Sequence, residues 1–306
     1  MDHRPRCHWR DMACIAKNWI NICDSFHLYA EFTLPSPQLI STESGEPANT
    51  ARTAVTGTLP KRLVDLRKFS RSSPDARLID MIDVPPEETS NDRFYATLSY
   101  CWGKAEFYKT IRANLGQGFV QLPHQDLPLT FRHAFRICKS LGSDFLWIDA
   151  LCIIQDSPED WKIESAKMPY IYSDASFCIA ADSSADANGG VCFKTSCWTE
   201  DVIEVRSHER MVIVCDTSKR DCLREPKPIH DSQVSQRGWK YRERVLSPKM
   251  LHFTSEKLFW ECRQEYLAED GTSTWIDHPL CPPPETLCAR VTARSFEGRF
   301  GAVAAW

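Results

Sequence analysis

The stretch FLWIDALCIIQD, residues Phe145–Asp156, decides the fold of this chain. Nine of its first ten residues are apolar, and the exception is a carboxylate, Asp149. A continuous apolar run rich in Ile, Leu and aromatic residues is typical of a strand buried on both faces, which occurs mainly in parallel sheets covered by helices. We therefore expect a strand over Phe145–Ile154. Because burying a lone charge is prohibitive, Asp149 must be hydrogen-bonded, paired or functional.

The segments around this run alternate between strand and helix patterns. They are a strand over Phe94–Cys101, an amphipathic helix over Leu129–Leu141, a helix that starts at Ser157, and a strand over Ser176–Ala181. Gly142 should end the first of these helices, and Pro169 should kink the second or end it early. This order of strands and helices predicts an α/β domain with a mainly parallel sheet.

The remaining segments set the domain boundaries. Residues 1–58 combine a helical pattern (Trp19, Ile22, Cys23, Phe26) with a linker rich in Pro, Ser and Thr. Residues 59–270 form the predicted domain, with core blocks at 95–247, and 271–306 are an irregular tail, for which truncation is one interpretation. Two antiparallel hairpins and one short helix are expected in the second half: Val202–Arg206 with Met211–Cys215, Met250–Phe253 with Leu258–Cys262, and Arg237–Leu246.

Composition excludes several classes of function. The 306 residues carry a net charge of −4, which gives no general attraction to nucleic acid or to an anionic membrane. The chain shows neither an apolar export signal nor a membrane-spanning run, so we expect a cytoplasmic protein whose fourteen cysteines are reduced and mostly buried. We expect no metal, because the cysteines and histidines near the N-terminus lack the paired spacing of a zinc site: Cys7, His8, Cys14, Cys23 and His27.

Candidate site residues gather where the predicted strands end, because ligands of open α/β sheets bind at the carboxyl ends of their strands. Asp149 could be a structural carboxylate or a functional one. Trp102 and Gly103 could contact a ligand, with the Trp ring stacking on a base, or could form a tight turn with an aromatic plug. Gln155 could orient a substrate or cap the following helix. Cys152 is expected to be a buried, inert thiol. A catalytic Cys/His pair would need His133 or His252 within hydrogen-bond reach of Cys152 and a lowered thiol pKa, and nothing in the sequence supplies either.

Four blocks of the chain, in this order, resemble the fungal heterokaryon incompatibility (HET) domain family. The blocks are YATLSYCWG at 95–103, LTFRHAFRICKSLG with FLWIDALCIIQD at 129–156, DWKIESAKMPYIYSDASFCIAA at 160–181, and RGWKYRERVLS at 237–247. The resemblance covers roughly residues 60–270, so the predicted domain is identified as a HET domain. In the last block Arg242 stands where the family usually has Gln, whereas Glu243 is retained.

The resemblance implies an effector of fungal allorecognition and programmed cell death that works with protein partners or by self-association. The fold of the family is similar to that of Toll/interleukin-1-receptor (TIR) domains, some of which hydrolyse NAD with a catalytic Glu, so NAD is a candidate substrate and no cofactor is expected. By this analogy Glu164, assisted by Asp149, is the candidate catalytic carboxylate, with Trp102, Gly103 and Gln155 as ligand-binding residues.

Each of these roles has a structural alternative. Glu164 could instead face solvent, where it would pair with Lys162 or Lys167 or cap a neighbouring element. Arg237, Trp239 and Glu243 are expected to close the sheet edge by an ion pair and ring packing, with a role toward substrate as the second interpretation. The rival hypotheses for the whole chain are a non-enzymatic signalling module of the same fold and an inert remnant.

Overall fold

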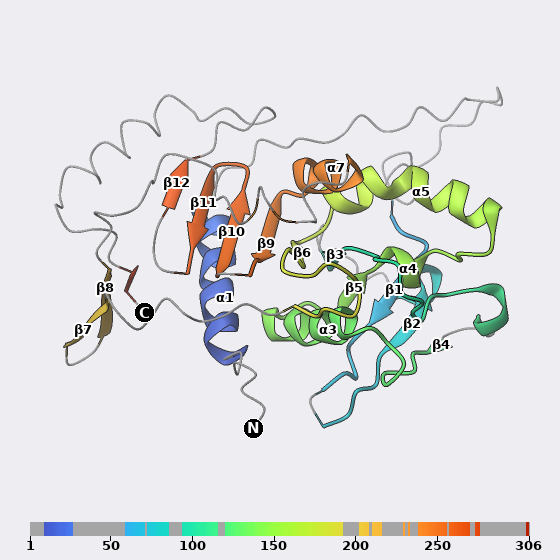
Figure 1. The fold of residues 1–306 in the computed structure, drawn as a ribbon, viewed down its shortest axis with the longest axis horizontal. Helices are drawn as coiled ribbons and strands as arrows, with labels where there is room; N and C mark the ends of the chain where they lie inside the picture. The colour runs from blue at the N-terminus through green and yellow to red at the C-terminus, as the bar shows by residue number, and fades with distance from the viewer. Residues whose placement is uncertain are drawn as a thin grey trace.

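A computed structural model describes residues 9–26, 59–70, 72–85, 94–115, 120–191, 202–207, 210–215, 229, 232, 238–255, 257–269, 273–275 and 304–305 (Figure 1). The helices are α1 Trp9–Phe26, α3 Leu129–Leu141, α4 Asp149–Cys152, α5 Pro158–Ser173 and α7 Gly238–Leu246, with single 3-10 turns η1 Met81–Asp83 and η3 Arg112–Asn114. Among these helices, none combines the length and the apolar character that a membrane crossing requires.

The described strands build one ten-stranded sheet and a second, three-stranded sheet. The large sheet has the order β12-β11-β10-β9-β6-β3-β5-β1-β2-β4, and the small one has the order β13-β8-β7. The strands are β1 Arg62–Asp65, β2 Arg77–Asp80, β3 Tyr95–Ser99, β4 Val120–Gln121, β5 Phe145–Trp147, β6 Cys178–Ala180, β7 Val202–Ser207, β8 Arg210–Cys215, β9 Lys249–Phe253, β10 Leu258–Cys262, β11 Glu265–Ala268, β12 Ser273–Trp275 and β13 Ala304–Ala305.

The centre of the large sheet is parallel, as the strand and helix order predicts. Strand β3 pairs in parallel with β5 and β6, and β6 pairs in parallel with β9. Helix α3 lies on one side of these strands, and α5 and α7 lie on the other (Figure 1). The carboxyl ends of β3, β5, β6 and β9 therefore meet at one edge of the sheet, between the two helical layers.

The prediction that the sheet is mainly parallel was wrong, because six of the nine pairings in the large sheet are antiparallel. Strands β1, β2 and β4 extend one edge, and β10, β11 and β12 extend the other. Short turns between consecutive strands account for β9–β10, β10–β11 and β11–β12, whereas each parallel pair needs a crossover of a dozen residues or more. The pairs β1–β5 and β2–β4 join strands that are far apart in the sequence. The expected hairpin β9–β10 is confirmed, as is β7–β8, which belongs to the small sheet.

The stretch at 145–156 also differs from its prediction. Strand β5 ends at Trp147, and the chain then turns into α4, with the amide of Cys152 bonded to the carbonyl of Ile148 at 2.7 Å. A fully apolar run does not distinguish a buried strand from a buried helical turn by its periodicity. Here the Asp149 carboxylate accepts a hydrogen bond from the amide of Ala150 at 2.7 Å, which favours the turn at this point.

Helices α3 and α5 follow their local signals, with one exception. Gly142 ends α3 in the left-handed conformation at φ 90°, and the Ser157 side chain caps α5 by accepting from the amide of Asp160. Pro169 was expected to kink α5 or to end it early, and the helix continues through Pro169 to Ser173, so it does not end early. The last turn is held by burial of Ile171 and Tyr172, and these contacts offset the roughly 3 kcal/mol that a proline costs inside a helix.

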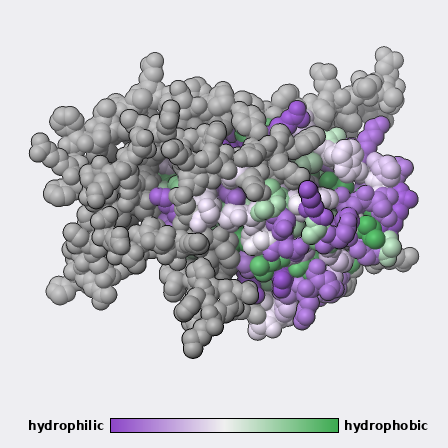
Figure 2. All heavy atoms as spheres, viewed as in Figure 1, coloured by the Kyte–Doolittle hydropathy of each residue, from purple (hydrophilic) through white to green (hydrophobic). Residues whose placement is uncertain are grey.

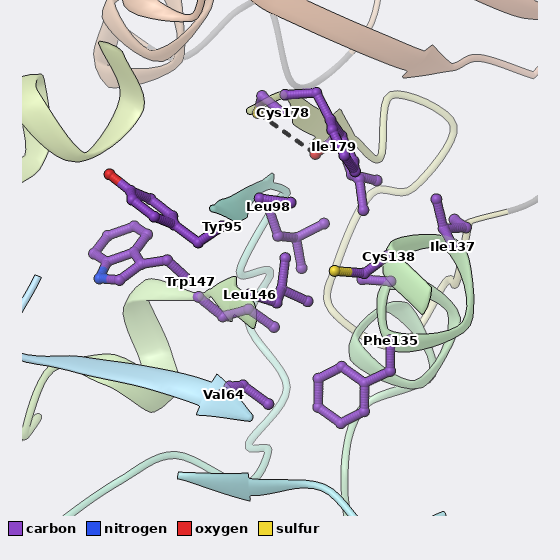
Figure 3. Packing of buried hydrophobic residues seen from close by; sticks show 14 of the residues in the cluster. Val64, Tyr95, Leu98, Phe135, Ile137, Cys138, Leu146, Trp147, Cys178 and Ile179 are labelled. Atoms are coloured by element: carbon purple, nitrogen blue, oxygen red, sulfur yellow. Dashed lines mark hydrogen bonds between the residues drawn. The ribbon is translucent and has the colours of Figure 1, made fainter. Parts of the chain in front are cut away.

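The core lies on both faces of the central strands. Leu98, Leu146 and Phe135 are on the α3 side of β3, whereas Tyr95 and Trp147 are on the opposite side (Figure 3). On the face drawn in Figure 2, the coloured residues are mainly purple or pale, with green hydrophobic side chains between them. Among the described large apolar side chains, Ile82, Trp161 and Ile163 are exposed. The cysteines with a described place in the core are buried: Cys23, Cys101, Cys138, Cys152, Cys178 and Cys262.

Candidate functional site

A half-buried carboxylate stands at the carboxyl ends of β3 and β5. Asp149 follows β5, and its two oxygens accept hydrogen bonds from side chains that follow β3. The Tyr100 hydroxyl donates to Oδ1 at 2.9 Å, and the Trp102 indole Nε1 donates to Oδ2 at 2.8 Å. The amide of Ala150 also donates to Oδ1. Two predicted site residues, Asp149 and Trp102, are thus in direct contact, and three donors hold the carboxylate in one orientation.

Aromatic packing keeps the two donors of Asp149 in place. The Tyr100 ring meets Phe131 of α3 edge-on at a centroid distance of 5.0 Å, and the Trp102 ring meets Phe107 at 5.4 Å. Burial raises the pKa of Tyr100 well above its usual 10, and the adjacent Asp149 charge raises it further. Tyr100 therefore remains a hydrogen-bond donor at neutral pH. Sequence reasoning did not select this residue, although its place one residue past the end of β3 was a usable signal.

Gln155 and Gly103 lie beside this pair in different ways. The Gln155 amide nitrogen donates to the carbonyls of Asp149 and Ile153, both at 3.0 Å, so it holds the chain that leaves α4. Gly103 is exposed and has φ +74°, and a Cβ atom placed on it would lie 2.2 Å from the Cβ of Asp186. Because Gly103 has no side chain, the loop after β6, which contains Asp186, can pack directly against its backbone.

Glu164 occupies a different position, on the buried side of α5. Its side chain is 1% exposed; Oε2 accepts from the backbone amide of Lys61 at 3.0 Å and Oε1 pairs with Lys167 at 2.8 Å. The pairing with Lys167 agrees with the structural alternative for this residue, but the side chain is buried where that alternative expected it to face solvent. The structure thus brings together Asp149, Trp102 and Gln155, while the described contacts of Glu164 tie α5 to the start of β1.

A second carboxylate, which the sequence placed at the sheet edge, lies at the end of β3. Ser99 is the last residue of that strand, and its hydroxyl donates to Glu243 Oε2 at 2.6 Å. Both side chains are buried. Glu243 comes from α7, so the contact joins segments 144 residues apart. Arg237 lies outside the described residues, as does the side chain of Trp239, so the ion pair expected there is not tested.

Nucleophilic thiol chemistry has no support at this edge. Cys152 is fully buried, burial raises its pKa to about 12, and its sulfur accepts from the amide of Ile148 at 3.5 Å. His133 accepts from the amide of Val191, and burial lowers its pKa to about 4. His252 is held between Asp182 and Glu261. Cys152 is therefore buried and inert, as the sequence analysis predicted.

The described residues contain no cluster of three or more His, Cys, Asp or Glu side chains that could hold a metal ion. Of the N-terminal residues considered for zinc, Cys7, His8 and His27 lie outside the described ranges. The expectation that the protein carries no metal is therefore not tested at its N-terminus.

A buried charge network is centred on His252 of β9, the strand that pairs with β6. His252 Nδ1 is 2.7 Å from Asp182 Oδ2, and His252 Nε2 is 2.8 Å from Glu261 Oε2. Arg244 of α7 also pairs with Glu261, at 2.7 Å. Burial by itself would lower the pKa of His252, but the two carboxylates outweigh it and raise that pKa. Burial would also raise the pKa of Glu261, but His252 and Arg244 lower it to about 2. This network ties α7 to β9 and β10.

Residues 95–243 match a family model described as Heterokaryon incompatibility protein (HET). The match begins at β3 and ends in α7 at Glu243, so it spans Asp149, Trp102 and the Ser99–Glu243 contact. No curated protein and no solved structure matches the chain significantly.

Proposed function

Because residues 95–243 belong to the heterokaryon incompatibility family, we propose that this chain is an effector of fungal allorecognition that triggers programmed cell death by hydrolysing NAD. A function related to heterokaryon incompatibility follows from the family itself. The observation that supports a chemical step is the oriented, half-buried Asp149 carboxylate beside the Trp102 indole at the carboxyl ends of β3 and β5. The proposed site of action is the cytoplasm, with protein partners or further copies of the chain as the activating contacts.

The proposed reaction requires mainly a carboxylate held next to the ribose of NAD. The bond between C1′ of the ribose and the nicotinamide nitrogen breaks, and its electron pair stays on the nitrogen, which leaves as neutral nicotinamide. Water adds to C1′ and releases one proton, so the products are ADP-ribose, nicotinamide and a proton. The transition state carries positive charge on the sugar, which an adjacent carboxylate stabilises.

Each site residue has a proposed part in this reaction. The Asp149 carboxylate stabilises the sugar, and the Trp102 ring, whose Nε1 is bonded to Asp149, offers a face on which a base can stack. Gly103 and Gln155 contact the ligand at the border of the site. Glu164 stays a proposed catalytic residue, and because Lys167 and the amide of Lys61 contact its two oxygens, it acts only if substrate displaces one of them.

Release of nicotinamide from NAD tests this proposal. Purified protein at high concentration, which permits assembly, is incubated with NAD and the products are separated by chromatography. Asp149→Asn keeps the shape of the side chain, removes its charge, and should lower kcat about 100-fold, the usual scale for one electrostatic contact. Glu159→Gln, at an exposed position of α5, is the matched control and should behave as wild type.

Two results would contradict the enzymatic proposal. One is a wild-type protein that releases no nicotinamide at any concentration. The other is equal activity in wild type and Asp149→Asn, with both folded by circular dichroism. Glu164→Gln, assayed in parallel, decides whether Glu164 takes part or only ties α5 to β1.

The second candidate function is a non-enzymatic signalling module that self-associates. It is favoured by the contacts of Glu164, since a carboxylate held by Lys61 and Lys167 suits a structural role. Expression of the chain in fungal cells separates the two functions. Toxicity that survives Asp149→Asn and Glu164→Gln supports the signalling module, and toxicity that disappears with NAD hydrolysis supports the enzyme.

A further inference from the structure

We infer that Glu243 of α7 is the second carboxylate of the Asp149 site, and that Ser99 positions it. This inference rests on the proposed function and assigns to that site a residue for which the sequence favoured a structural part at the sheet edge. The evidence consists of the contact of Glu243 with the last residue of β3, its electrostatic effect on two tyrosines, and unpartnered polar atoms on the same face of the sheet.

Two consecutive residues at the end of β3 donate hydrogen bonds to the two carboxylates. Ser99 donates to Glu243 at 2.6 Å, and the next residue, Tyr100, donates to Asp149 at 2.9 Å. Side chains of consecutive residues in an extended chain point to opposite faces, so the two carboxylates lie on either side of the same strand end. This is the edge of the parallel strands at which α/β sheets bind their ligands.

Both charges act on the same two phenols. Burial is the main cause that raises the pKa of Tyr100, followed by Asp149 and then Glu243. For Tyr172 of α5, burial is again the main cause, and both Glu243 and Asp149 raise the pKa further. Tyr172 donates its hydroxyl to the carbonyl of Leu98 at 3.2 Å, one residue before Ser99. The charges of Asp149 and Glu243 therefore both raise the pKa of a tyrosine at this strand end. Glu164 is not among the causes that raise the pKa of either tyrosine.

The face of the sheet that carries Ser99 also has polar atoms without partners. Thr97 lies two residues before Ser99 on the same face, and it pairs in register with Trp147 of β5. Thr97 Oγ1 and Trp147 Nε1 are both fully buried, and neither has a hydrogen-bond partner within the described part of the chain. Buried polar atoms are normally satisfied, so these two indicate a water or a polar ligand group beside Ser99 and Tyr172.

The two carboxylates differ in burial. Asp149 is half-buried and accepts from Tyr100, Trp102 and the amide of Ala150, so it adds its negative charge from the entrance of the site. Glu243 is 9% exposed and lies deeper, where low polarity strengthens its attraction for the positive charge that develops at C1′ as nicotinamide leaves. Glu243 is thus a second proposed catalytic carboxylate that acts together with Asp149, and Ser99 is a positioning residue that acts through Glu243.

The test is nicotinamide release by Glu243→Gln, Ser99→Ala and the double variant, with Glu159→Gln as the matched control. Glutamine keeps an oxygen that accepts from Ser99, so a purely structural tie between α7 and β3 survives in Glu243→Gln. We expect this variant to lower kcat about 100-fold with KM within about threefold, and Ser99→Ala to lower kcat about tenfold. The double variant should be no slower than Glu243→Gln, because Ser99 acts only through Glu243.

The outcomes separate this inference from the function on which it rests. If wild type releases nicotinamide and a folded Glu243→Gln keeps its kcat, the inference is wrong while the proposed function stands. If Glu243→Gln does not fold, Ser99→Ala decides, since a folded Ser99→Ala with wild-type kcat also refutes the inference. A wild-type protein without activity refutes the proposed function itself, and the role of Glu243 with it.

Discussion

Replacing Glu261 with glutamine should remove a pH-dependent part of the stability of this protein. Glu261 accepts hydrogen bonds from His252 and Arg244 inside the sheet, and it is 12% exposed. Burial raises its pKa, but these two cations outweigh burial and lower it from 4.5 to about 2. Glutamine has nearly the same shape and keeps one accepting oxygen, which can face His252 and Arg244, while its amide nitrogen takes the place of the oxygen that accepts from Tyr266. The substitution therefore tests the charge with little change in packing.

The magnitude follows from the shift. A change of about 2.5 units corresponds to roughly 3 kcal/mol of stability at a pH above the unfolded value of 4.5, and this contribution falls to about 1 kcal/mol at pH 3. The sign follows from proton binding: between pH 4.5 and 2 the unfolded chain binds a proton at Glu261 that the folded chain does not, so acid destabilises the fold. The raised pKa of His252 arises partly from the same His252–Glu261 interaction, so it adds no further stabilisation energy to this value.

His252 sets the alkaline limit of this contribution. Its folded pKa lies above the unfolded 6.5, so its share is complete below pH 6.5 and is lost as the pH rises through the folded value. The advantage of wild type over Glu261→Gln should therefore be largest between about pH 4.5 and 6.5. Urea unfolding followed by far-UV circular dichroism at pH 3, 5.5 and 8.5 measures this difference. Unfolding free energies of the two proteins that run parallel across this range would refute the reasoning.

Two further predictions concern local features of the same domain. Gly103→Ala should cost roughly 3 kcal/mol in urea unfolding, because the new Cβ adds a clash with Asp186 to a left-handed φ, whereas Gly142→Ala, with open space around it, should cost only about 1 kcal/mol; equal costs would mean that the loop carrying Asp186 moves aside freely. Native alkylation with iodoacetamide, mapped by mass spectrometry, should modify exposed Cys14 and leave Cys152 intact until the protein unfolds, since the pKa of Cys152 is about 12 and its thiolate is scarce at pH 8; modification of Cys152 at the rate of Cys14 would contradict its burial.

The elements that the sequence predicted correctly depend on local chemistry. Helix α3 has an apolar face followed by Gly142, and α5 begins with a Ser157 cap and Pro158 at its first position. Strand β3 alternates large apolar residues with smaller ones and ends near a Trp-Gly turn, and helices follow β3 and β5 in the chain. Capping and periodicity act within a few residues, so the sequence by itself states them.

Long-range pairing decided what the sequence left open. The apolar run after Phe145 suits a strand and a helical turn equally, and the chain turns at Asp149, whose carboxylate is bonded to Tyr100 and Trp102. Helix α5 passes Pro169 because its last turn is buried against the sheet. The antiparallel strands at both edges follow from which segments meet there, which no local pattern encodes.

The candidate site shows the same division. The sequence by itself determined that a carboxylate stands at the end of a central strand with Trp102 and Gln155 near it, because parallel strands bring their carboxyl ends to one edge. Only the tertiary structure decided which glutamate contacts the end of β3. Glu164 is bonded to Lys61 and Lys167, while Glu243 reaches the end of β3 through Ser99, 144 residues away in the chain. A contact across that separation arises from packing α7 against the sheet, and spacing in the sequence carries no record of it.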